Sequence, residues 1–140
     1  MHTGKNDNQQ LSSSYWGALF AFVGGLAVIL GAFGAHGLED QLTPESIDAY
    51  QTAVQYQFLH VLSGLLVIAL SNTLNLKWPR LILTFQLLGI ILFSGSIYLL
   101  STKSLTGIEW SFLGPITPIG GVFFIISWLL LAISFLTSAK

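Results

Sequence analysis

The side chains best suited to chemistry lie on the apolar segment from Ala53 to Gly64. Tyr56, Gln57 and His60 recur there at spacings of three and four residues, which place them on one face of a helix. A phenol, an amide and an imidazole on one face could bind a ligand or relay a proton, because a neutral histidine both donates and accepts. The same groups could instead satisfy one another in a helical core, and the sequence leaves both interpretations open.

No catalytic residue, metal site or cofactor is predicted. His36 lies near Glu39 and Asp40, but this spacing matches no specific metal motif and is typical of a solvated acidic loop. The glycines form neither GxGxxG nor GxxxxGK[ST], and there is no cysteine to act as a thiol nucleophile. No paired titratable groups suggest an active site, so we expect the protein not to be an enzyme.

The composition predicts an integral membrane protein. Apolar residues make up 53% of the 140 residues and charged residues only 8%, against about 25% charged residues in an ordinary soluble domain. The formal net charge of −1 provides no basic field for holding nucleic acid, so we expect no nucleic-acid partner.

Four apolar segments can each cross the hydrocarbon core of a bilayer, which is about 30 Å thick. We predict spans over 15–35, 44–71, 81–100 and 117–136. The predicted fold class is therefore all-α, an integral membrane four-helix bundle, with one domain over 15–136. Residues 1–14 are polar and predict a flexible tail. Thr43–Pro44 and Thr117–Pro118 each place an N-cap residue before a proline, which favours helix starts at these two points.

Glycines concentrate at the end of the first span and at the start of the last span, on the same side of the membrane. They are Gly31, Gly34, Gly37, Gly120 and Gly121. Because small residues let helix backbones approach each other in lipid, we expect these two segments to pack together. The row Gly17-x-x-x-Ala21-x-x-x-Gly25 is expected to pack inside the bundle for the same reason.

Four sequence segments, taken together, resemble a known family. They are GAFGAHGLE (31–39), YQTAVQYQFLH (50–60), FSGSIYLL (93–100) and GPITPIGG (114–121). The chain is similar over about residues 15–136 to the YgdD/YwdK-like family of small bacterial inner-membrane proteins of unknown function, and to a small mitochondrial transmembrane protein of animals. The resemblance implies four spans, but no substrate, reaction or cofactor. The family's signature positions fall on His36, Gln51, Tyr56, Gln57, His60, Ser94, Gly95, Thr117, Pro118, Gly120 and Gly121.

Two functional hypotheses follow. We expect a non-enzymatic accessory or scaffold subunit whose partners are the lipid bilayer and either other membrane proteins or further copies of itself. The alternative is a binder or carrier of a small lipophilic or protonatable ligand between the helices. The candidate ligand-binding residues are His36, Gln57, His60 and Ser94.

The distribution of basic residues predicts the orientation in the cell inner (plasma) membrane. One side of a four-span arrangement carries Lys5, Lys77, Arg80 and Lys140, and the other carries only Lys103. Since cytoplasmic segments are enriched in lysine and arginine, both termini are expected in the cytoplasm.

This orientation can be tested with single cysteines, because the chain has none. We expect a cysteine at Asp40 or Lys103 to react with an impermeant thiol reagent in intact cells. A cysteine at Asn75 or Ser138 should react only after lysis. Labelling at position 75 from outside the cell would contradict the prediction.

Overall fold

Residues 3–138, which a computed structural model describes, form long helices and no strand. The α-helices that make up the spans are α1 (Thr3–Phe33), α2 (Pro44–Thr73), α3 (Pro79–Gly89), α4 (Gly95–Ser101) and α6 (Ile116–Ser138). The short elements are α5 (Lys103–Thr106), the π-helical turns η1 (Gly34–Leu38) and η2 (Ile90–Ser94), and the 3-10 turn η3 (Ser111–Leu113). Four stretches are long and apolar enough to cross a membrane: Ser14–Leu38, Pro44–Ser71, Pro79–Ser101 and Ser111–Ser138. The predicted all-α, four-span architecture is confirmed.

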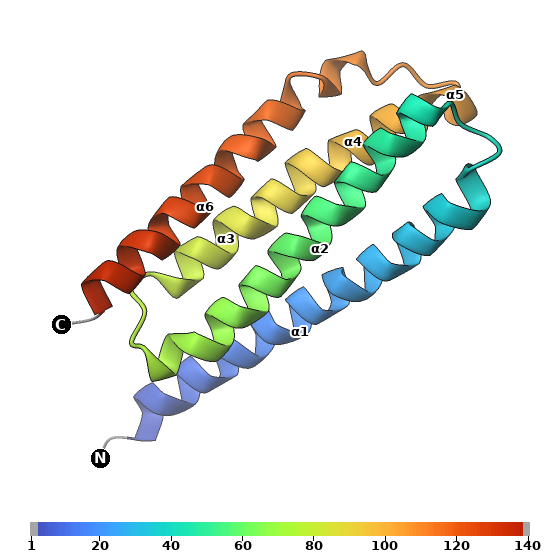
Figure 1. The fold of residues 1–140 in the computed structure, drawn as a ribbon. Coiled ribbons are helices and arrows are strands. Elements are labelled where there is room, and N and C mark those ends of the chain that lie inside the picture. The colour runs from blue at the N-terminus through green and yellow to red at the C-terminus, as the bar shows by residue number, and fades with distance from the viewer. Residues whose placement is uncertain (1–2, 139–140) are drawn as a thin grey trace.

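The spans are arranged so that each packs chiefly against its neighbour in the chain. Figure 1 shows α1 beside α2, α2 beside the rod formed by α3, η2 and α4, and α6 on the other side of that rod. The early part of α1 and the late part of α6 lie at the same end of the bundle. Of the four spans, the first has the smallest share of buried residues, because α1 packs chiefly against α2 alone. Much of its surface therefore faces outward.

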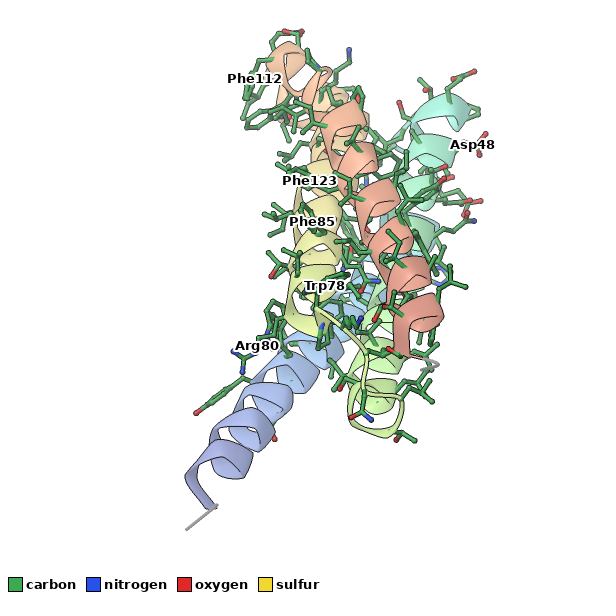
Figure 2. The ribbon with its side chains drawn as sticks, turned by 90° about the vertical axis from the view of Figure 1, so that its left-hand side faces the viewer. Asp48, Trp78, Arg80, Phe85, Phe112 and Phe123 are labelled. Atoms are coloured by element: carbon green, nitrogen blue, oxygen red, sulfur yellow. The ribbon has the colours of Figure 1, made fainter. Side chains whose placement is uncertain are left out.

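The two ends of the bundle carry different side chains. Figure 2 places Trp78 and Arg80 toward one end, and Asp48 and Phe112 at the other. Tryptophan and arginine are anchoring residues of membrane interfaces, so the first pair marks the interface at the α2–α3 turn.

The α2–α3 turn is tied to the last helix by two serines, Ser134 and Ser138, of which Ser138 donates from its hydroxyl to the carbonyl oxygen of Asn75 (3.1 Å). The hydroxyl of Ser134 accepts from the backbone N–H of Lys77 (2.7 Å) and donates to its carbonyl oxygen (3.0 Å). Both Asn75 and Trp78 adopt positive φ angles, of 48° and 55°. These left-handed residues turn the chain sharply, so that α3 begins at Pro79 with its fixed φ already suited to a helix.

The two predicted helix starts have different outcomes. Thr43 caps α2 as expected, since its hydroxyl accepts from the N–H of Ser46 (3.3 Å). Thr117 is not an N-cap, because α6 already begins at Ile116. Its hydroxyl instead shares a hydrogen bond of 2.7 Å with Ser96 across the bundle. Pro118 is accommodated because the first turn of a helix does not need its missing amide hydrogen.

Helix α1 extends upstream of its membrane-crossing stretch, which begins at Ser14, next to the predicted start of the first span at residue 15. The helix begins at Thr3, upstream of Tyr15, and no proline interrupts it. Residues 1–2 of the predicted 1–14 tail lie outside the described part of the chain. The division into a tail and a domain over 15–136 therefore stays a prediction.

The third span contains a π-helical turn that the sequence analysis did not predict. The N–H of Gly95 bonds to the carbonyl of Ile90, five residues back, within the otherwise α-helical rod. Gly120 of α6 lies directly against the backbone of Leu92 and Phe93 in this turn. The close contact of α6 is therefore with η2.

The predicted packing of the first span's end against the start of the last span is wrong. A Cβ at Gly34 would lie 2.7 Å from the ring of Tyr50 in α2, while Gly120 faces η2. At Gly31 the nearest atom belongs to Val54 of α2 (3.3 Å), and at Gly37 to Phe33 of the same helix (2.7 Å). Gly121 makes only ordinary contact with Phe93 (3.8 Å). The glycines do permit close approach, but the end of the first span packs on α2 and the start of the last span packs on η2.

The small-residue row of α1 does not pack inside the bundle either. Gly17 and Gly25 have no atom within 4 Å of a Cβ placed on them, and Ala21 is exposed. Gly24, one residue further round the helix, is the glycine that meets α2, at Val61 (3.0 Å). Thus α1 has two small-residue faces, one buried against α2 and one open.

Alanine at position 120 should destabilise the bundle. Its Cβ would overlap the backbone nitrogen of Phe93, which cannot move aside as a flexible side chain can. Overpacking of this kind costs about 1–3 kcal/mol, so Gly120→Ala should lower Tm in detergent. The matched control is Gly25→Ala, which has free space and should hold or raise Tm. Equal effects at both positions would refute the close contact.

Candidate functional site

Three hydrogen-bonded clusters of buried polar groups lie between the spans in addition to the Ser96–Thr117 and Ser134–Lys77 contacts, and the first of the three is centred on His60. Its Nδ1–H donates to the carbonyl of Tyr56 (2.7 Å), and its Nε2 accepts from the indole N–H of Trp128 (3.1 Å). The ring stacks on Phe124 at 3.5 Å between centroids, and the residue is 2% exposed. Because one nitrogen donates and the other accepts, the geometry corresponds to a neutral imidazole with both nitrogens used.

The second cluster is centred on Gln57. Its Nε2 donates to the carbonyl of Val23 in α1 (2.9 Å), and its Oε1 accepts from the hydroxyl of Tyr98 in α4 (2.8 Å). The ring of Tyr98 packs against Tyr50 with centroids 4.9 Å apart, and the Tyr50 hydroxyl donates to the carbonyl of Leu30 (3.1 Å). Gln57 therefore ties three spans together and keeps neither end of its amide free.

The third cluster, of Gln86 and Ser63, was missed by sequence reasoning. Gln86 Nε2 donates to Ser63 Oγ (2.8 Å), but Oε1 has no partner among the described residues although the residue is fully buried. An uncharged amide in the middle of an apolar span was the available signal. Its spacing to other polar residues of its own helix forms no recognisable pattern, because its partner comes from α2.

The four sequence-predicted ligand residues are only partly brought together. Gln57 and His60 lie on the same buried face of α2, together with Ala53 and Gly64. Ser94 is fully buried in η2, and its hydroxyl has no partner in the described structure. His36 is exposed in η1 and takes no part in the three clusters.

The acidic residues do not combine with His36 into a recognisable site. Among the side chains that the structure describes, no group of three or more His, Asp or Glu residues is placed to hold a metal ion. Most of the buried polar groups instead form hydrogen bonds with one another or with the backbone, and Gln86 Oε1 and the Ser94 hydroxyl are the exceptions named above.

The model of a family described as "Protein of unknown function (DUF423)" matches residues 30–121 of the chain. The chain belongs to the DUF423 family. Of the three clusters, His60, Gln57, Tyr98, Gln86 and Ser63 all lie within the matched DUF423 region. The open α1 row from Gly17 to Gly25 and the indole of Trp128 lie outside it.

The DUF423 relatives are themselves membrane proteins. A UPF0382 membrane protein of Staphylococcus epidermidis is 48% identical over 117 residues, covering 81% of this chain and 88% of the relative. The UPF0382 membrane protein YwdK of Bacillus subtilis is 41% identical over 117 residues, covering 78% and 85%. A UPF0382 membrane protein of Haemophilus influenzae is 41% identical over 114 residues, covering 81% and 87%. The YwdK-like resemblance and the membrane assignment are confirmed, and no solved structure matches the chain.

Removing the Tyr98 hydroxyl should destabilise this DUF423 protein. Tyr98→Phe keeps the ring against Tyr50 but leaves the buried Oε1 of Gln57 without a donor, which costs about 1–3 kcal/mol. Thermal unfolding in detergent should therefore show a lower Tm. Tyr15→Phe, at a position 75% exposed, is the control and should leave Tm unchanged. An unchanged Tm in Tyr98→Phe would show that the hydrogen bond contributes nothing.

Proposed function

We propose that this DUF423 protein is a non-enzymatic accessory or scaffold subunit of the cell inner membrane, with both termini in the cytoplasm. It binds a transmembrane helix of another membrane protein through the open row of α1. The observation that carries this proposal is that Gly17 and Gly25 have no atom within 4 Å of a Cβ placed there. The bundle leaves this face uncovered.

The open row has the composition of a helix-docking surface. Gly17, Ala21, Gly25 and Ala32 follow helical spacing along one side of α1, with the larger, exposed Val28 between the last two. Small residues at such spacing let a second helix approach closely, so that dispersion and backbone contacts replace lipid contacts. Bulky residues such as Phe22 and Ile29 occupy the neighbouring exposed surface and border the row.

Two of the three connections between spans are short, which also favours a partner within the membrane; the third, over residues 102–115, is longer. Only residues 39–43 separate η1 from α2, and residues 74–78 separate α2 from α3. Segments of this length offer little surface for a soluble partner, whereas the exposed sides of the spans are extensive.

The ligand-carrier hypothesis loses its main support. Gln57 and His60 direct their polar atoms to protein partners, at Val23, Tyr98, Tyr56 and Trp128. An enzymatic role has no support either, since His60 is the only histidine in the buried core and no carboxylate is buried among the described residues.

Site-specific cross-linking tests the docking row directly. Ala21→Cys, carrying a photoactivatable cross-linker, should trap one membrane protein in intact cells at a stoichiometric yield. Gly17→Leu or Gly25→Leu in the same background should abolish the adduct, since a leucine side chain would hold the two helices apart.

The control is Ala69→Cys, at an exposed position of α2 away from the row, which should trap no such partner. Ala69→Leu, which adds the same bulk as a leucine in the row, should leave the Ala21 adduct intact. An adduct only with a second copy of the chain would replace the accessory role with self-association, and no adduct at all would overturn the proposal.

A further inference from the structure

The two buried glutamines of the spans differ in one respect. Gln57 is 4% exposed and has a protein partner at each end of its amide. Gln86 is fully buried, yet its Oε1 has no partner among the described residues. In a bilayer core, where no bulk water is present, an unpaired buried acceptor is destabilising.

Exchanging the two ends of the Gln86 amide does not remove the unpaired group. In the exchanged orientation the Ser63 hydroxyl would donate to Oε1, and the amide nitrogen would lose the only acceptor it has. Either orientation leaves one polar end of Gln86 unmatched by protein atoms. The deficit is therefore a property of the site.

The hydroxyl hydrogen of Ser63 has no acceptor among the described residues. Serines in helices usually donate to a carbonyl of the preceding turn, as Ser71 does to Ile68 (2.8 Å) and Ser127 does to Phe124 (2.8 Å). The Ser63 hydroxyl makes no such bond and only accepts from Gln86 Nε2. Its hydrogen is available for another acceptor beside Gln86.

The distances suit one small bridging molecule. Ser63 Oγ lies 2.8 Å from Gln86 Nε2, and the two polar atoms of a carboxamide are about 2.2 Å apart. Ser63 Oγ and Gln86 Oε1 are thus at most about 5 Å apart, within the roughly 5.6 Å that a water molecule spans with two hydrogen bonds of about 2.8 Å.

The surroundings limit what can occupy this position. Leu83 and Ile90, on the same face of the rod as Gln86, are buried and apolar, and so is Val67 one turn from Ser63. Such walls disfavour a charged group. The occupant must both donate to Oε1 and accept from the Ser63 hydroxyl.

We propose that Gln86 and Ser63 bind a single buried water molecule between α2 and α3. The water donates one hydrogen to Gln86 Oε1 and accepts the hydrogen of the Ser63 hydroxyl. Buried waters of this kind make two to four hydrogen bonds to groups that the protein leaves unsatisfied. The bound water completes the polar link between the two helices.

Water-selective NMR of the ¹⁵N-labelled full chain in detergent micelles tests the site. Rotating-frame cross-relaxation from water should give a signal at the Nε2 hydrogens of Gln86, opposite in sign to chemical exchange. Gln57, which is 4% exposed and has a protein partner at each end of its amide, is the internal control and should give none. Side-chain-to-backbone correlations assign both amides, so this comparison requires no variant.

Ser63→Ala should reduce the Gln86 signal to the level of Gln57, because the water loses its second anchor. If that variant does not fold, Ser63→Thr, which keeps the hydroxyl, should retain the signal. The comparison of Gln86 with Gln57 in the unmodified chain tests the bound water without any variant. No water signal at Gln86, or equal signals at Gln86 and Gln57, would overturn the proposal.

Discussion

The hydrocarbon core of a bilayer offers no bulk water to a polar group, so an amide, hydroxyl or imidazole inside it is stabilised by a partner held within the bundle. The arrangement of this bundle follows from that constraint. Gln57 holds α1, α2 and α4 together because both ends of its amide need partners, and His60 draws the indole of Trp128 from α6 toward α2 for the same reason. Apolar packing alone would give the helices little reason to prefer one rotation over another, since lipid tails are as apolar as leucine.

Close backbone contact is the second determinant, and it depends on where the polar groups have placed the helices. The π-helical turn η2 widens the third span locally, and the backbone of Phe93 there lies against Gly120 of α6. The ring of Tyr50 similarly lies against Gly34, and its hydroxyl donates a hydrogen bond to the carbonyl oxygen of Leu30. Glycine is needed at these two positions because the neighbouring group occupies the space of a side chain.

Sequence reasoning predicted what depends on local composition. The number and approximate extent of the spans follow from apolar length, and the start of α2 follows from the Thr43–Pro44 signal. The buried face of Gln57 and His60 follows from helical spacing. The prediction of an N-cap at Thr117 was wrong because its hydroxyl bonds to Ser96 in another span. The local N-cap signal cannot reveal such a partner.

The partners of the polar groups could not be predicted for the same reason. Gln86 and Trp128 gain their roles from residues in other spans, and the π-helical turn has no known signature in composition. The outward direction of Gly17 and Gly25 depends on which side of α1 meets α2, and both sides carry small residues. Helix–helix contacts of this kind are set by the whole bundle.

The hydrogen bond between His60 and Trp128 joins residues 68 positions apart in the chain. During synthesis, α1 and α2 enter the membrane first, and Gln57 Nε2 can bond to Val23, 34 positions upstream, as soon as this hairpin forms. The Nε2 of His60 must wait until the last span has been made. A nascent chain that lacks α6 would thus hold an imidazole within the membrane whose Nδ1 is bonded to Tyr56 but whose Nε2 has lost its Trp128 donor.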